Sequence, residues 1–118
     1  MGILREKINA SATVEIPVLV KFMNGTEGDF TGVFKRLGQE RIDALADPEA
    51  EYRNSEIIDE VLVGVRGIAE SDPSQELPAD EQLAWVKQQP ECVNAAVVAF
   101  FRRMRPARYD EKTSKKRR

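Results

Sequence analysis

Apolar residues recur at every second position over the first clear pattern of the chain, the stretch TVEIPVLVKF at residues 13–22, and the mainly polar opposite face consists of Glu15, Pro17, Leu19 and Lys21. A period of two is typical of a β-strand that buries one face. Pro17 lies on the polar face, and because proline has no N–H to donate to a neighbouring strand, it indicates an edge strand or a break. The apolar face of this predicted strand consists of Val14, Ile16, Val18, Val20 and Phe22.

A turn and a second strand follow. The turn signal NGTEG, residues 24–28, leads into DFTGVFKRL, where Phe30 and Phe34 share one face on either side of the small Gly32. Two strand-like segments that flank a turn of about four to six residues predict a β-hairpin.

Helical spacing replaces the alternation in the middle of the chain. Residues 37–46 suit a short amphipathic helix that Asp47-Pro48 ends, because the residue before a proline avoids helical backbone angles. A second helix is predicted to begin at Asn54 or Ser55, which are both good N-cap residues. Its apolar stripe has helical spacing and consists of Ile57, Ile58, Val61, Leu62 and Val65.

Two further helices are predicted in the second half of the chain. The first covers residues 80–89, with Asp80 as N-cap and with Leu83 and Val86 facing inward. The second runs from residue 91 to about residue 104 and has the strongest apolar face of all the segments.

The order of these elements predicts an α+β fold, in which an N-terminal β-hairpin is followed by a small cluster of about four α-helices. Residues 1–105 are expected to form this single domain, which suits a chain of 118 residues. No hydrophobic periodicity remains after Pro106. Residues 106–118 are therefore expected to be a basic and disordered C-terminal tail.

The second predicted helix contains a GxxG motif, Gly64 to Gly67, with Arg66 inside it. In KH domains such a loop brings the backbone close to nucleic-acid phosphates and is followed by a helix. Here Asp72-Pro73 follows soon after, which leaves no room for that helix, and the surrounding sequence is acidic. We therefore interpret the motif as a helix C-terminus whose glycines provide a left-handed cap, with a solvated Arg66.

The residue types exclude several kinds of chemistry. The chain has one cysteine, Cys92, and no histidine, which excludes an internal disulfide, a Cys/His zinc site and a Ser/His/Asp triad within it. Cys92 is interpreted as a small, partly buried hydrophobic residue rather than a reactive thiol. Paired carboxylates are adjacent in sequence and do not face each other on a helix. We expect neither enzymatic activity nor a cofactor.

The compartment is predicted from hydrophobic segments and the N-terminus. No segment approaches the roughly 20 apolar residues that span a bilayer. The N-terminal residues carry early charges and lack the order of a signal peptide. Both observations predict a cytoplasmic protein with no membrane partner.

Charge is distributed unevenly along the chain. Residues 1–101 hold nine basic and eighteen acidic residues, whereas residues 102–118 hold nine basic and two acidic residues. This asymmetry is compatible with three roles for the basic end: binding of polyanions, binding of the acidic body of a neighbouring copy or another acidic partner, or solvation without a dedicated ligand. These three alternatives stay open at the level of sequence.

Apolar side chains cover more than half of the circumference of the last predicted helix. Val98 and Phe101 form a second apolar flank beside its main face, and Trp85 lies at the edge of the preceding helix. Each of the three either completes the core or contacts a partner, since partner interfaces are enriched in aromatic residues.

The order of the segments resembles a known family. ATVEIPVLV, FTGVFKRLGQERIDAL, EIIDEVLVGVRGI and ELPADEQLAWVKQQP, followed by a long apolar helix and a basic end, are similar to the tail assembly chaperones of long-tailed bacteriophages. The resemblance covers roughly residues 8–110, and its most specific part is EVLVGVRGI followed by LP. Val65 stands where the family often has an aromatic residue, and the DPSQE loop lacks a frequent Asp-Gly turn.

The resemblance implies a non-enzymatic assembly factor. Such a chaperone binds the tape measure protein, keeps it soluble and promotes tail tube assembly, with tail tube protein as a possible second partner. It forms homo-oligomers in the host bacterial cytoplasm and is absent from the mature virion. A longer frameshifted form is frequent in the family. The residues expected to contact partners are Trp85, Val98, Phe101, Lys115, Lys116, Arg117 and Arg118.

Two rival functions remain. One is a small nucleic-acid-binding regulator that uses the basic C-terminal tail, although the acidic body favours a protein that binds no nucleic acid. The other is a structural tail-completion or head–tail connector subunit, which would be found in purified virions.

Overall fold

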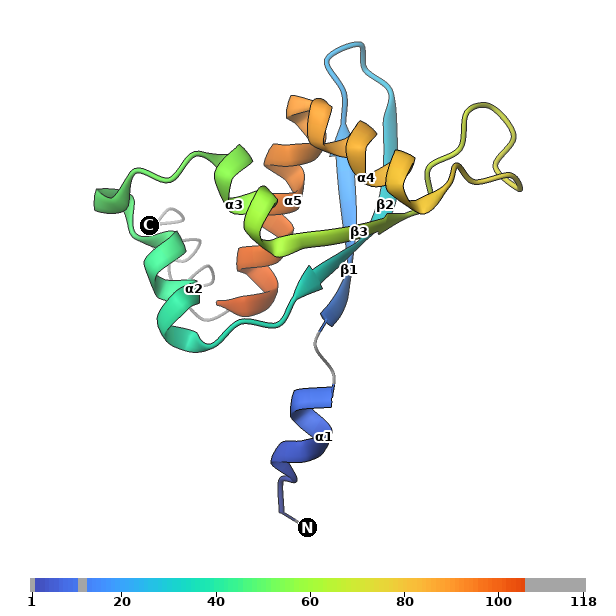
Figure 1. Cartoon of the computed structure of the whole chain (residues 1–118). Helices are drawn as coiled ribbons and strands as arrows, with labels where there is room; N and C mark the ends of the chain where they lie inside the picture. Colours follow the sequence, from blue (N-terminus) through green and yellow to red (C-terminus); the bar gives the residue numbers. More distant parts are fainter. Residues whose placement is uncertain (1, 11–12, 106–118) are drawn as a thin grey trace, which may run out of the picture.

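The computed structural model describes residues 2–10 and 13–105, so the predicted tail at residues 106–118 lies outside the described residues (Figure 1). In chain order the elements are α1 (Arg5–Ala10), β1 (Thr13–Lys21), β2 (Glu27–Lys35), α2 (Gln39–Ala46), the short 3-10 helix η1 (Pro48–Ala50), α3 (Asn54–Val61), β3 (Leu62–Arg66), α4 (Ala79–Gln88) and α5 (Pro90–Met104).

The predicted hairpin is confirmed. β1 and β2 pair antiparallel from Thr13 opposite Lys35 to Lys21 opposite Glu27. Burial alternates along both strands as the sequence pattern requires, so the even-numbered apolar side chains face the core. The strand order is β1-β2-β3, which places Pro17 on an edge strand. On an edge strand, the N–H that proline lacks does not remove a hydrogen bond from the interior of the sheet.

A third strand corrects the prediction for residues 54–65. The helix ends at Val61, and the chain continues directly as β3, which pairs antiparallel with β2. Leu62 lies opposite Phe34 and Gly64 lies opposite Val33, so the ladder contains a bulge at Val63. Because of this bulge, Leu62 and Val65 are both 1 % exposed although they are three positions apart. A spacing of three therefore looked helical in the sequence.

The GxxG motif is consequently not a helix C-terminus. Gly64 lies within β3, where an added Cβ would come within 3.3 Å of the Cβ of Val33. Gly67 follows the strand with a φ of 101°, a conformation that strongly favours glycine. Arg66 forms an ion pair with Glu15 of β1, and both side chains are more than half exposed. The next helix begins only at Ala79, so no helix completes a KH-type phosphate site.

Within residues 2–10 and 13–105, four α-helices follow the hairpin, as predicted, and α1 precedes it as an unpredicted fifth. α5 packs against β1 and α3, while α4 packs against β3 (Figure 1). The centre of the core is aromatic: the rings of Phe34 and Phe100 are 5.5 Å apart, and Phe101 meets Phe100 edge to face at 5.3 Å. Aliphatic side chains from the sheet and from α2 to α5 surround these rings.

α3 begins at Asn54, as predicted, but none of the predicted caps, Asn54, Ser55 and Asp80, occupies the N-cap position of its helix. α3 is preceded by Arg53, whose backbone N–H donates to the side chain of Glu56 at 2.9 Å. Pro78 occupies the N-cap position of α4, in place of the predicted Asp80. In both helices an acidic residue still lies in the first turn, where it interacts favourably with the helix dipole.

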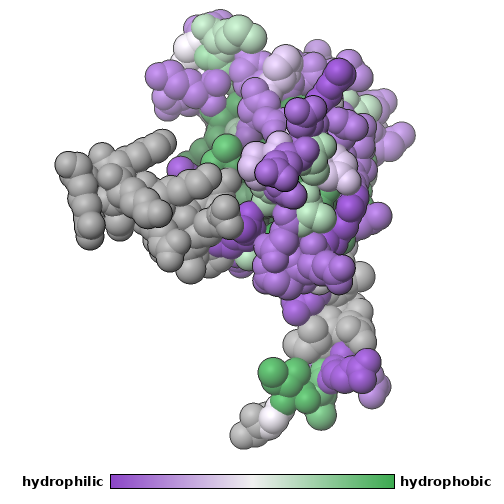
Figure 2. Space-filling model, turned by 90° about the vertical axis from the view of Figure 1, so that its left-hand side faces the viewer, coloured by the Kyte–Doolittle hydropathy of each residue, from purple (hydrophilic) through white to green (hydrophobic). Residues whose placement is uncertain are grey.

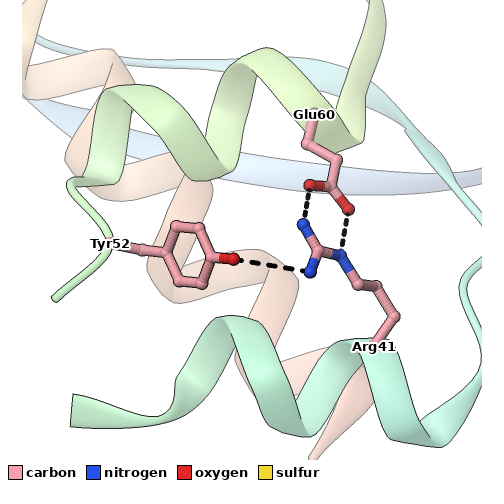
Figure 3. Close-up of polar contacts among 3 residues, drawn as sticks. All are labelled: Arg41, Tyr52 and Glu60. Carbon is pink, nitrogen blue, oxygen red and sulfur yellow. Dashed lines mark hydrogen bonds and ion pairs between the residues drawn. The ribbon is translucent and has the colours of Figure 1, made fainter. Parts of the chain in front are cut away.

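Arg41 connects α2 to α3 (Figure 3). Its Nε donates to Glu60 Oε2 at 2.7 Å, and a second guanidinium nitrogen bonds the other carboxylate oxygen. The same guanidinium donates to the Tyr52 hydroxyl at 3.5 Å and lies 5.6 Å from the centre of its ring. The hydrogen bonds from Arg41 lower the pKa of Glu60 below its ordinary value. These contacts fix Tyr52 beside α3.

Glu60→Gln is expected to lower the stability of the protein at neutral pH by a small amount, because the pair is partly exposed. Since the pKa of Glu60 is lower in the folded state, its contribution is present above the ordinary glutamate pKa and is lost as the pH falls through the folded value. Urea unfolding of the two proteins between pH 7 and pH 3 should show the difference shrinking with acidity. Glu81→Gln, at an exposed position of α4, is the matched control. A difference that does not depend on pH would contradict the expectation.

Candidate partner-binding surface

The outer edge of β1 is the first part of the candidate surface. Phe22 N donates to Thr26 O at 2.8 Å, on the side of β2. Backbone groups alternate along a strand, so the odd-numbered residues of β1 point theirs away from β2. Pro17 is one of these residues and removes a donor from the edge. Met23 N donates to the Glu91 carboxylate at 3.1 Å, which shows that α5 begins beside the end of β1.

A shallow groove of about 560 Å³ runs between this edge and α5. We call it the edge groove. Its middle is apolar, and the exposed Arg102 and Arg103 lie at one end. Its lining consists of Ile16, Pro17, Leu19, Asn94, Ala95, Val98, Ala99, Arg102 and Arg103.

Large apolar side chains remain exposed along the edge groove and beyond it. Leu19 is 80 % exposed and Val98 is 41 % exposed within the groove. At the end of the hairpin Met23 is 83 % exposed, and Trp85 of α4 is 40 % exposed with its ring 6.3 Å from that of Phe22. Isolated exposed apolar residues are ordinary, but several along one edge indicate a binding surface.

The structure separates the residues that the sequence singled out as partner contacts. Trp85 and Val98 are on the surface, beside and within the edge groove. Phe101 is only 6 % exposed and packs on Phe100, which corrects its assignment as a partner contact: of the two alternatives, it belongs to the core. Lys115, Lys116, Arg117 and Arg118 lie outside the described residues.

Sequence reasoning missed Leu19 and Met23, which are the most exposed apolar residues of this surface. Leu19 was placed correctly on the outward face of β1, but it was counted among the polar positions. A leucine at an outward position of a predicted edge strand was the available signal, because such positions are usually polar or charged. Met23 had no comparable signal, since it flanks a turn.

Cys92 is buried, at 1 % exposure, at the start of α5. Burial, with a smaller contribution from the neighbouring Glu91, raises the pKa of its thiol to about 11. The interpretation of this residue as a small hydrophobic side chain is therefore supported, and a thiolate nucleophile at neutral pH is not.

The Cys92 thiol is expected to react about 200-fold more slowly at pH 8 than an ordinary cysteine, because a pKa near 11 leaves on the order of one thiol in a thousand ionised. Steric protection slows the reaction further. Labelling with an aromatic disulfide reagent, followed by absorbance, measures the rate. The matched control is the same protein in concentrated urea, where the rate should rise to that of a free thiol. Equal rates in the two conditions would show that Cys92 is accessible.

Two further features, a metal site and a membrane-spanning helix, are absent from the part of the chain that the structure describes. In residues 2–10 and 13–105, no group of three His, Cys, Asp or Glu side chains could hold a metal ion. Over the same residues, no helix has both the length and the apolar character needed to cross a membrane. The large exposed apolar side chains in and beside the edge groove make it the candidate functional surface.

Comparison of the chain with protein-family models, with curated proteins and with solved structures finds no match. The function is accordingly inferred from the surface of this chain and from the resemblance of its segments to the tail assembly chaperones.

Proposed function

We propose that the protein is a tail assembly chaperone of a long-tailed bacteriophage, which binds the tape measure protein through the edge groove and has no enzymatic activity. One observation carries the proposal: Leu19, Met23, Trp85 and Val98, four of the large exposed apolar residues of the described chain, gather along one edge of the domain. The tape measure protein is inferred as the partner from the resemblance of the sequence segments to this family. Binding keeps the tape measure protein soluble and promotes tail tube assembly.

The dimensions of the groove suit a helical partner. From Pro17 to Lys21 the edge of β1 is about 13 Å long, since a strand rises about 3.3 Å per residue. A helix of about nine residues has the same length and presents two or three apolar side chains on one face. A long helical chain such as a tape measure protein, with repeated apolar stripes, would accept many copies of the chaperone.

The charge of the domain suits this role as well. Residues 1–101 have nine basic against eighteen acidic residues. Copies bound along one partner would therefore present like charge to solvent and to other complexes, which opposes aggregation. We propose that several copies act together on one tape measure chain, and that tail tube protein is recruited to this complex as a second partner.

Co-expression with the tape measure gene from the same phage tests the proposal. We expect the wild-type protein to raise the soluble fraction of tape measure protein and to be recovered in a complex with it. Val98→Glu places a charge in the apolar part of the edge groove and should remove most of this effect. Val63→Glu is the matched control, because Val63 is also 41 % exposed but lies on β3, outside the groove.

Two results would contradict the proposal. An unchanged soluble fraction, with no complex recovered, would show that the protein is not a chaperone of this partner. Detection of the protein in purified virions by mass spectrometry would favour a tail-completion or connector subunit, because the proposed chaperone acts in the host cytoplasm and leaves before the virion matures.

A further inference from the structure

A second hollow of about 290 Å³ lies between α2, η1, α3 and α5, away from the edge groove. Its floor is apolar: Leu45, Ile57, Val97 and Phe101 are between 3 % and 7 % exposed. The lining also includes two acidic residues, Asp47 and Glu51, and the aromatic residue Tyr52. We call this site the α2–α5 pocket.

The walls of the α2–α5 pocket are held in place by local bonds. Asp47 accepts a hydrogen bond from Glu49 N at 2.9 Å and so caps η1. Glu51 has a φ of 55°, a left-handed conformation that is uncommon for residues other than glycine. This turn leads into Tyr52, which Arg41 contacts from α2 (Figure 3). The pocket therefore has a defined shape before any ligand enters.

The chain leaves the described structure at this pocket. Arg105, the last described residue, lines the pocket, and its Nε lies 3.5 Å from the carboxylate of Asp43. Its side chain is only 15 % exposed. A smaller hollow lined by Asp43, Asp47 and Arg105 adjoins the pocket. Residues 106–118 therefore begin beside two hollows that carry carboxylates.

The pocket and the C-terminal residues are complementary in charge. Residues 39–51 contain five acidic residues and a single basic one, Arg41, which already pairs with Glu60. Residues 106–118 contain six basic and two acidic residues, and their single aromatic residue is Tyr109. An apolar pocket with a carboxylate rim suits an aromatic ring flanked by cationic side chains.

We propose that residues 106–118 bind the α2–α5 pocket of their own chain, with the ring of Tyr109 on the apolar floor and basic side chains beside Asp47 and Glu51. Tyr109 follows Arg105 by four residues, a reach of about 13 Å when extended. Attachment at the rim gives the segment a high effective concentration, so its own pocket is filled before that of a second copy. The acidic body thus engages the basic end, and added salt weakens the contact.

Photo-crosslinking of the full chain tests the proposal. Tyr109→benzoylphenylalanine places an aromatic probe at the proposed docking residue, and mass spectrometry locates its cross-links. We expect cross-links to Leu45, Ile57 or Phe101 within monomeric product at about 50 mM salt. Asp47→Asn with Glu51→Gln should reduce their yield about fivefold. Asp80→Asn with Glu81→Gln, the same changes at exposed positions of α4, is the matched control and should leave the yield unchanged.

The outcomes separate docking within one chain from docking by a second copy and from no docking at all. Cross-links between two copies, identified by mixing isotopically labelled and unlabelled protein, would show that a second copy fills the pocket and would overturn the proposal. Cross-links spread over the surface, with equal yield in both double variants, would show that the segment does not dock at all. Asparagine at position 47 can still cap η1, so the pocket variant is expected to fold, and circular dichroism checks this.

Discussion

Phe100→Ala is expected to lower the free energy of unfolding by about 3–5 kcal/mol, the largest effect of any substitution considered for this protein. Phe100 is fully buried on α5, 5.5 Å from the ring of Phe34 on β2 and 5.3 Å from that of Phe101. Truncation removes a large apolar side chain and also leaves a cavity. The neighbouring rings cannot move in to fill that cavity, because they are held on the strand and the helix that form the core.

Urea or thermal unfolding, followed by circular dichroism, measures this loss. Leu19→Ala is the control because Leu19 is 80 % exposed, and its effect should stay within about 0.5 kcal/mol. The comparison also separates stability from function, since Leu19 belongs to the edge groove. A loss of under about 1 kcal/mol for Phe100→Ala would show that the core packs differently from the structure described above.

Gln82→Met is expected to cost about 2 kcal/mol, the second largest effect, although it exchanges side chains of similar length. Gln82 is the buried polar residue of α4, at 4 % exposure. Its Oε1 accepts from Ile68 N at 2.9 Å, and its Nε2 donates to Leu77 O at 2.6 Å. Methionine can replace neither bond, so two half-buried backbone groups lose their partners.

The loss should be greatest where Gln82 holds the loop between β3 and α4. Hydrogen exchange, read by NMR, is expected to accelerate at the Ile68 amide, because that N–H loses its acceptor. Gln88→Met is the matched control, since Gln88 lies exposed at the end of the same helix. Unchanged protection of Ile68 in Gln82→Met, with unchanged stability, would contradict the assigned role.

The candidate surface could be predicted only in part. Helical spacing identified Val98 and Phe101 as a second flank of α5, but only the packing showed that Phe101 meets Phe100 and Val98 faces the groove. Sequence periodicity gives the angle of a residue around its helix, whereas burial depends on which elements lie at that angle. Leu19 became part of a site because α5 runs beside its strand.

Gln82 shows the same limit for polar residues. Hydrophobic spacing assigned Leu83 and Val86 to the inward face of α4. Val86 is fully buried and Leu83 is half-buried, whereas Gln82 is buried because it bonds two backbone groups of the loop between β3 and α4. A polar side chain is buried where partners satisfy its hydrogen bonds, and those partners come from tertiary contacts.

By itself, the sequence determined the α+β order, the hairpin and the two C-terminal helices, since alternation, turn residues and prolines act over a few neighbouring positions. The tertiary structure decided that Leu62–Arg66 form a third strand. Its apolar residues Leu62 and Val65 have helical spacing, but β2 offers backbone partners and a bulge at Val63 turns both side chains inward. Pairing with a strand about 30 residues earlier outweighed the local preference, because backbone hydrogen bonds and burial in the common core were gained together.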